Sequence, residues 1–398
     1  MQTNIQSKPS ALSFDNTEIA FKSKSNNELT QSYLLFKAIG YNWLVKLGPP
    51  MVNGAFSIGL PIKGLIKSTV FKQFCGGESM DDCNNTIDQL YSYGVGTILD
   101  YSVEGEEKEE SFNATATETL ETISKAKNNP KIPFCVFKVT GLARFDLLAK
   151  VSAKEKLTST EESEWGRVKN RIHNICKTAH DNNVRIFIDA EESWIQPAID
   201  DLAHDMMREF NLQKCIVYNT IQLYRHDRLA FLKTSFDDAV KYNYYLGLKL
   251  VRGAYMEKER ERALKMGYPS PIQPDKASSD KDYNDALHFC IEHIDRINVC
   301  AGSHNEQSSM LLTELMAQKG LANNDQRIYF SQLYGMSDHI SFNLSSAGYN
   351  VAKYLPYGPV KAVMPYLFRR AAENTSVKGQ AGRELTLISR EVARRKKG

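Results

Sequence analysis

Eight short apolar runs rich in Val, Ile, Leu, Phe and Tyr recur from residue 95 onward, and each is followed by a longer segment whose apolar residues return at helical spacing. Continuous apolar runs are typical of strands covered on both faces, and their alternation with helices indicates parallel crossover units. Eight such units close into a (βα)8 barrel, so we expect an α/β fold of that kind. The runs are residues 95–103, 134–141, 185–192, 215–224, 245–255, 297–305, 327–335 and 351–358.

An open doubly wound sheet is the alternative arrangement of alternating strands and helices. Its dinucleotide-binding fingerprint would be a glycine-rich turn directly after the first strand. The similar sequence here, Gly94–Leu99, begins before that strand and lacks the third glycine. We therefore favour the barrel.

The first ninety residues (1–90) precede the barrel as a mostly helical arm, and we assign residues 91–398 to the barrel domain. Within the arm, residues 51–74 mix apolar residues with lysines. Such a segment could lie on a membrane surface or pack against the barrel wall, and we favour packing. The basic tail, residues 389–398, is compatible with contact to an anionic surface.

Composition limits the partners and the compartment. The formal net charge of +3 in 398 residues is nearly balanced, so there is no indication of nucleic-acid binding. The polar start does not resemble a signal peptide, and the apolar stretches are shorter than a membrane span. The 7 cysteines are odd in number and lack metal-type spacing, so we interpret Cys135, Cys215 and Cys300 as small core residues. We expect a protein of a reducing, cytoplasmic compartment.

Polar residues end most of the predicted strands. In a (βα)8 barrel the functional site forms at the carboxyl ends of the strands, so these residues are expected to share one mouth. They include Lys138, Asp189, Glu191, Gln222, Arg252, Ser303, His304, Asn305, Tyr334 and Tyr354.

Three of these residues allow two interpretations each. Lys138 would be costly to bury alone, so we expect it to face an anion in the mouth or to pair with Asp189. Asp189 itself is either a helix N-cap or a site carboxylate. His304 could bind a metal, but the sequence offers no second ligand at suitable spacing, which favours a hydrogen-bonding role.

Two adjacent arginines follow the last predicted strand. If a helix begins just after Gly358, Tyr366, Arg369 and Arg370 project from one face of it. Guanidinium groups bind carboxylate or phosphate oxygens well, although charged pairs of this kind are more often solvated surface. Over the barrel mouth they would face Lys138 across a space lined by tyrosines. Such a pocket suits a small anion with an apolar body, as an amino acid is.

The sequences KLVRGAYMEKER, YLPYGP and PYLFRRAAEN, with FKVTG, IDAE and FSQLYGM, resemble the proline dehydrogenase family. The resemblance covers roughly residues 90–380. It implies a distorted (βα)8 barrel with non-covalent FAD at the carboxyl ends of the strands. It also implies oxidation of L-proline to Δ1-pyrroline-5-carboxylate, with electrons passed to a membrane quinone. Peripheral contact with the inner face of the cell membrane, or with the matrix side of the mitochondrial membrane in a eukaryote, is compatible with it.

The resemblance also implies roles for individual residues. Asp189 would orient the tyrosines and Lys138. The proline carboxylate would be bound by Lys138, Arg369 and Arg370, and the proline ring enclosed by Ala254, Tyr255, Leu333, Tyr354 and Tyr366. FAD would be bound at the flavin ring by Gln222 and Lys249, and elsewhere by Arg252, Gly253, Lys276, His304, Asn305 and Glu373.

Three positions refine these expectations. Lys249 stands where many bacterial members carry arginine, and Glu106 resembles the glutamate that pairs with the first arginine when the site closes. Tyr354 argues for proline as substrate, since members that prefer hydroxyproline are expected to have a small residue there. Two other functions remain open: a Schiff-base aldolase with Lys138 as nucleophile, and a non-catalytic barrel that binds an amino acid.

Overall fold

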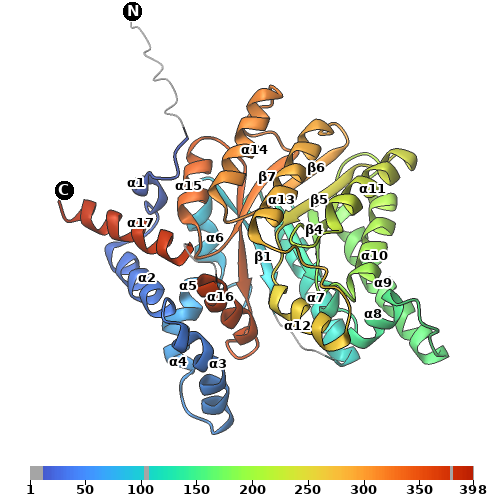
Figure 1. The fold of residues 1–398 in the computed structure, drawn as a ribbon, viewed down its shortest axis with the longest axis horizontal. Coiled ribbons are helices and arrows are strands. Elements are labelled where there is room, and N and C mark those ends of the chain that lie inside the picture. Colours follow the sequence, from blue (N-terminus) through green and yellow to red (C-terminus); the bar gives the residue numbers. More distant parts are fainter. Residues whose placement is uncertain (1–11, 103–106, 377–379, 398) are drawn as a thin grey trace, which may run out of the picture.

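The central feature of the molecule is a closed barrel of eight parallel strands, paired in sequence order (Figure 1). The structure is a computed structural model. It describes residues 12–102, 107–376 and 380–397, and of residues 42–46, 53, 372–376, 380 and 381 the backbone alone. The strands coincide with all eight predicted runs, which confirms the (βα)8 prediction. They are β1 Val95–Tyr101, β2 Phe134–Lys138, β3 Arg185–Asp189, β4 Val217–Gln222, β5 Leu246–Val251, β6 Ile297–Gly302, β7 Ile328–Leu333 and β8 Val351–Tyr357.

The strand register brings residues from distant parts of the sequence to one level of the barrel. Lys138 at the end of β2 is the Cα partner of Asp189 on β3, and Leu333 on β7 is the partner of Tyr354 on β8. Since all strands run the same way, their carboxyl ends meet at one mouth.

Aromatic side chains fill the opposite, amino-terminal end of the barrel. Phe134 of β2 stacks on Phe187 of β3 with ring centroids 4.4 Å apart, and Tyr218 of β4 meets both rings edge-on at 5.4 Å. The guanidinium of Arg185 covers the Phe134 ring at 5.3 Å. Because this layer occupies one end, space for a ligand lies at the other end.

Helices cover the outside of the barrel between successive strands (Figure 1). Their ends carry recognisable signals: Thr158 begins α9 in a capping box with Glu161, whose carboxylate accepts the Thr158 N–H at 3.0 Å. These elements, including the 3-10 turn η2, are α7 Glu109–Ala126, η2 Val139–Gly141, α8 Phe145–Ser152, α9 Ser159–Asp181, α10 Gln196–Phe210, α11 Arg228–Lys241, α12 Met256–Met266, α13 Lys276–Glu292, α14 Glu306–Gln318 and α15 Asp338–Ser346.

The arm is helical, as predicted, and lies beside the two C-terminal helices, α16 (Met364–Ser376) and α17 (Gln380–Arg395) (Figure 1). Arm and C-terminal helices share a second core, in which Phe36 meets Phe74 edge-on at 6.3 Å. The arm elements are α1 Thr17–Ala20, α2 Asn26–Ile39, α3 Asn42–Ser57, α4 Lys63–Ile66, the π-helix η1 Lys67–Phe71, α5 Lys72–Phe74 and α6 Asn84–Tyr91.

Residues 51–74 satisfy the packing prediction only in part. Ile66, Phe71 and Phe74 are buried in the core shared with α16 and α17. Met51, Ile58, Leu60 and Leu65 are instead exposed. Among the described residues, no helix has the length and apolar character needed to cross a membrane.

The helix with the two arginines begins later than predicted. Residues 360–363 form turns, and α16 starts at Met364 instead of directly after Gly358. Pro365 supplies the reason, because proline lacks the N–H that an interior helical residue donates and is tolerated in the first turn. A helix running on from Gly358 would have placed Pro365 in its interior.

Candidate active site

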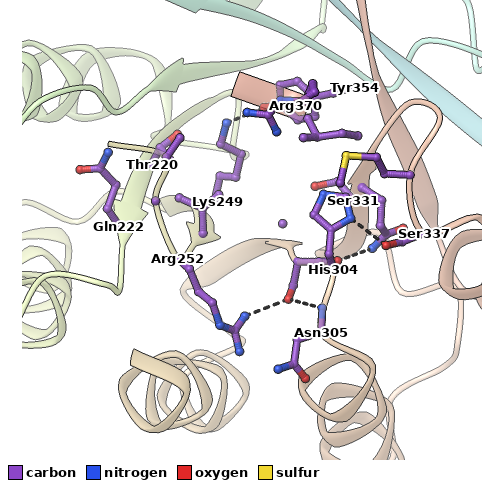
Figure 2. A pocket seen from close by; sticks show the side chains of 18 of the residues that line it. Thr220, Gln222, Lys249, Arg252, His304, Asn305, Ser331, Ser337, Tyr354 and Arg370 are labelled. Carbon is purple, nitrogen blue, oxygen red and sulfur yellow. Dashed lines mark hydrogen bonds between the residues drawn. The ribbon is translucent and has the colours of Figure 1, made fainter. Parts of the chain in front are cut away.

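A cavity of about 700 Å³ opens at the carboxyl ends of the strands. All eight strands contribute to its wall, and α16 contributes as well. Figure 2 shows Tyr354 and Arg370 at one end and Arg252, His304 and Asn305 at the other. The strand residues, taken in order from β1 to β8, include Asp100, Lys138, Asp189, Gln222, Lys249, Gly302, Leu333 and Tyr354.

The cavity gathers the residues that the sequence assigned to substrate and cofactor. Two predicted residues lie outside what the structure describes: Glu106 falls in the segment 103–106, and the side chain of Glu373 is among those left undescribed. The cavity wall includes Lys138, Asp189, Gln222, Lys249, Arg252, Gly253, Ala254, Tyr255, Lys276, His304, Asn305, Leu333, Tyr354, Tyr366, Arg369 and Arg370.

Asp189 is the common partner at the end near Tyr354. Its carboxylate lies 3.7 Å from Lys138 Nζ, accepts a hydrogen bond from Lys249 Nζ, and accepts one from the Tyr354 hydroxyl at 3.5 Å. The next helix, α10, has its N-cap at Ile195. The N-cap interpretation of Asp189 is therefore wrong, and its carboxylate lines the cavity instead.

Lys138 lies between two carboxylates. Its Nζ is 3.5 Å from Asp100 Oδ1 and 3.7 Å from Asp189 Oδ2, and it also lines the cavity. The predicted pairing with Asp189 is therefore confirmed. Contact of Lys138 with an anion in the mouth stays a prediction. Asp100 is a cavity residue absent from the predicted set, although its position near the end of a predicted strand is the same signal that indicated the others.

Lys249 extends toward Tyr354 (Figure 2). The side chain is buried, and its Nζ donates to Asp189 and, at 2.5 Å, to the Tyr354 hydroxyl, with the Phe187 ring centroid 5.2 Å away. Burial raises the pKa of Tyr354 well above its usual value, and Asp189 raises it further, so the phenol stays neutral. Lys249 thus orients Tyr354, a contact that the resemblance did not suggest.

Arg252 is fixed at the opposite end by three side chains. It donates to Asp280 at 2.7 Å and to the hydroxyls of Ser303 and Ser308 at 2.9 Å each. Lys276 also pairs with Asp280. Burial alone would raise the pKa of Asp280, but Lys276 and Arg252 outweigh it and lower that pKa. Two cations around one carboxylate leave this end positive, which suits an anion.

His304 is a neutral hydrogen-bonding residue. Its Nδ1 lies 2.9 Å from Ser337 Oγ, and burial, with the nearby charge of Lys353, lowers the pKa of His304 to about 3. Across the described ranges there is no group of three His, Cys, Asp or Glu side chains that could hold a metal, which favours the hydrogen-bonding interpretation. Asn305 is the N-cap of α14 and accepts the Ser308 N–H at 3.0 Å.

Gly253 keeps the chain close to the cavity after β5. Its φ of +132° is rarely adopted by residues with a side chain, and a β-carbon there would overlap the Tyr224 ring. The turn therefore presents backbone, without a side chain, to the cavity wall.

Two cavity residues could not be found from strand-end motifs. His339 of α15 lies 3.0 Å from Glu306 through its Nε2. Arg383 of α17 donates to the same Glu306 at 2.8 Å and to Asp15 at 3.1 Å. Arg383 follows the last strand by many residues, so only the return of α17 to the barrel brings it to the mouth.

A sequence model of the family described as Proline dehydrogenase matches residues 83–383, which is most of the chain. The chain belongs to the proline dehydrogenase family. This confirms the resemblance seen in the motifs. Membership of the family favours an oxidoreductase over the Schiff-base aldolase and the non-catalytic barrel.

Individual relatives agree with the family assignment. Proline dehydrogenase 1, mitochondrial, from Dictyostelium discoideum is 33% identical over 95% of this chain and 74% of its own length. Hydroxyproline dehydrogenase from Xenopus laevis is 31% identical over 97% of this chain and 90% of its own length. Both substrates are thus named among proteins that align with nearly the whole chain.

A solved structure supports the fold. Proline utilization A from Bdellovibrio bacteriovorus, inactivated by N-propargylglycine, superposes with a TM-score of 0.72 at 21% identity over 94% of this chain. This chain spans 40% of that protein. The similarity concerns the barrel fold, and the rest of the larger protein has no counterpart in this alignment.

Proposed function

We propose that this protein is an FAD-dependent proline dehydrogenase that oxidises L-proline to Δ1-pyrroline-5-carboxylate. The observation that carries the proposal is one cavity lined by Lys138 of β2 and by Arg369 and Arg370 of α16, beside Tyr354 and Tyr366. Three cations next to aromatic rings suit a small carboxylate with an apolar ring.

The other end of the cavity suits FAD. Gln222 is buried, and its Oε1 meets no hydrogen-bond donor within the described part of the chain, so a ring N–H of the flavin would satisfy it. Arg252 and Lys276 would favour the diphosphate, which the backbone at Gly253 leaves room to approach. When bound, FAD would accept a hydride from C5 of proline at its N5.

The contribution of the protein is to position the substrate. Lys138, Arg369 and Arg370 would hold the carboxylate, and Tyr354, held by Asp189 and Lys249, would bound the proline ring. Such positioning can supply several kcal/mol of the barrier reduction. Because Tyr354 is restrained from two sides, we infer that proline is preferred over hydroxyproline, whose extra hydroxyl needs space there.

An anaerobic titration of the purified protein with L-proline tests the proposal. The protein should be yellow, and its flavin absorbance should bleach as proline is added, with hydroxyproline required at higher concentration for the same effect. A colourless protein that binds proline would support the binding barrel. A borohydride-trapped adduct at Lys138 with a carbonyl substrate would support the aldolase.

We also propose a membrane quinone as electron acceptor. After anaerobic bleaching, a soluble short-chain quinone should restore the flavin absorbance faster than dissolved oxygen does. Faster restoration by oxygen would argue for an oxidase instead.

A further inference from the structure

Helix α12, which follows β5, has almost no apolar packing. Of its 11 residues, all of which the structure describes, only Glu259 and Ala263 are buried. Leu264 is 86% exposed and Met266 is 58% exposed. By comparison, α10 buries an apolar face that includes several Leu, Ile and Met side chains. Since helices are normally held on a domain by burial of an apolar face, other interactions must hold α12 in place.

A buried carboxylate provides the strongest of these interactions. Glu259 is fully buried, and its two carboxylate oxygens accept hydrogen bonds from the N–H and the hydroxyl of Ser193, each at 2.6 Å. Ser193 belongs to the loop that connects β3 to α10. Burial of a carboxylate is costly unless its oxygens are hydrogen-bonded. Glu259 therefore favours the arrangement in which α12 lies against this loop.

The residues next to Ser193 and Glu259 add to the contact. Lys258 forms an ion pair with Glu192, and the guanidinium of Arg262 lies 4.4 Å from the centre of the Trp194 ring. The Lys258 side chain is 57% exposed, so its ion pair contributes less than the buried hydrogen bonds of Glu259 do. We define the α12 contact as Glu192, Ser193 and Trp194 of the loop with Lys258, Glu259 and Arg262 of the helix.

The α12 contact connects two parts of the cavity wall. The loop begins directly after Asp189, and Asp189 and Ala190 both line the cavity. On the other side, Tyr255 is the N-cap of α12, and Ala254 and Tyr255 line the cavity. The Tyr255 carbonyl accepts the Glu259 N–H at 2.9 Å, so the two residues lie one helical turn apart. The position of α12 therefore sets the position of Tyr255 relative to Asp189.

We propose that Glu259 is a positioning residue, which holds α12 through Ser193 and so keeps Ala254 and Tyr255 close enough to Asp189 to enclose the substrate. Glu259 does not itself line the cavity, so it would act through Tyr255. The inference rests on the proposed function, in which the substrate is proline. A wall that contacts the ring equally in the bound and the reacting state contributes to binding, so its displacement raises KM more than it lowers kcat.

Steady-state kinetics of Glu259→Gln test this role. The amide has nearly the shape of the carboxylate, but its NH2 group would face one of the two Ser193 donors and could not accept from it. We expect KM for proline to rise about tenfold, with kcat per bound flavin within about twofold of wild type. Glu261→Gln is the matched control, because Glu261 is exposed on the same helix and does not line the cavity. Its KM should equal that of the wild type.

Limited proteolysis of the full-length holoprotein tests the contact without reference to activity. Trypsin cleaves after lysine and arginine, and α12 contains Lys258, Arg260, Arg262 and Lys265. A folded helix is cleaved after it opens locally, so the cleavage rate reports how firmly α12 is held. Cleavage within α12, mapped by mass spectrometry, should be about tenfold faster in Glu259→Gln than in wild type or Glu261→Gln.

A second variant keeps the test decisive if Glu259→Gln does not fold. Ser193→Ala removes the hydroxyl donor but keeps the carboxylate and the backbone N–H. Ser193→Ala should therefore change KM and the cleavage rate in the same direction as Glu259→Gln, by a smaller factor.

The inference is overturned if α12 of Glu259→Gln and Ser193→Ala is cleaved at the wild-type rate, or if their KM for proline equals that of Glu261→Gln. A lower kcat with unchanged KM would also overturn it, because that result would indicate an effect on the reaction step and not on binding. Failure of the proposed function appears instead in the wild type, as a flavin that proline does not bleach. Cleavage by trypsin does not require proline and would still decide whether Glu259 holds α12.

Discussion

At the scale of single residues, Asp189 connects side chains from several strands at the cavity. One carboxylate contacts Lys138, Lys249 and the Tyr354 hydroxyl, which come from three other strands. A group with several charged partners constrains each of them, so its loss should disturb the substrate end without unfolding the barrel.

We predict that Asp189→Asn lowers kcat/KM for proline by about a hundredfold, because Lys138 and Tyr354 lose the charge that orients them. Flavin content should remain that of the wild type. The measurement is steady-state kinetics together with the flavin to protein absorbance ratio. Asp181→Asn is the control, since Asp181 is exposed, pairs with Lys177 and His180 of its own helix, and does not line the cavity. Equal kinetics in the two variants would contradict the role of Asp189.

Glu191 gives a prediction about pH. Burial raises the pKa of Glu191 from 4.5 to about 7, although Thr140 donates hydrogen bonds to its carboxylate. Between these two values the folded state binds more protons than the unfolded state, so this group makes stability fall as pH rises from about 4.5 to about 7.

Glu191→Gln should remove that dependence. Relative to wild type, the variant should gain up to about 3 kcal/mol of unfolding free energy across this interval, from about 1.4 kcal/mol per pKa unit. Urea unfolding at a series of pH values measures the difference. The exposed Glu162 provides the control: the difference in unfolding free energy between Glu162→Gln and wild type should be nearly the same at every pH. A difference that is also independent of pH for Glu191→Gln would contradict the raised pKa of Glu191.

At the scale of elements, hydrogen bonds connect the arm to the loop after β7. The Gln73 side chain of α5 donates to the Gly335 carbonyl at 2.8 Å, and Ser32 of α2 donates to Gln73 at 2.9 Å. The loop continues into Met336 and Ser337, which line the cavity. The packing of the arm therefore helps to position the loop residues that form part of the cavity wall.

We predict that Gly335→Ala destabilises the protein more than Gly348→Ala does. Both glycines have positive φ, +76° and +85°, and so share the backbone cost of about 1–2 kcal/mol. A β-carbon at Gly335 would also overlap the Gln73 carbonyl, whereas at Gly348 its nearest neighbour is 4.0 Å away. Thermal unfolding measures the difference, and equal losses of Tm would show that arm contact contributes nothing.

At the scale of the whole molecule, a buried charge cluster joins barrel, helix layer and arm. Lys353 of β8 is fully buried and pairs with Asp338 of α15 at 2.9 Å, and Lys24 of the arm lies 3.6 Å from the same carboxylate. Burial would raise the pKa of Asp338, but Lys353 and Lys24 outweigh it and lower that pKa.

Removing the shared carboxylate of Asp338 should therefore lower the free energy of unfolding more than removing the Lys24 cation does. We predict that Asp338→Asn lowers the unfolding free energy by about 3–5 kcal/mol, because Lys353 would be left buried without its anion. Lys24→Met should cost about 1 kcal/mol or less, since the Lys353 pair remains. Denaturant unfolding measures both; a larger loss for Lys24→Met would contradict this order.

The barrel and most of its mouth followed from sequence alone. Apolar runs must be covered on both faces, which requires alternating strands and helices, and the carboxyl ends of parallel strands meet at one edge. That is why residues as distant as Lys138 and Tyr354 could be assigned to one cavity before their contacts were known. Asp100 carried the same strand-end signal.

Only the tertiary structure decided the features that depend on contacts between segments far apart in the sequence. Lys249 pairs with Asp189 and Tyr354, which lie on other strands. Arg383 reaches the cavity from α17, and Ile58 is exposed instead of packed. Each of these features depends on how segments far apart in the chain pack together. Periodicity records which side of an element is apolar, but not which partner covers that side or leaves it uncovered. Only the assembled fold supplies that information.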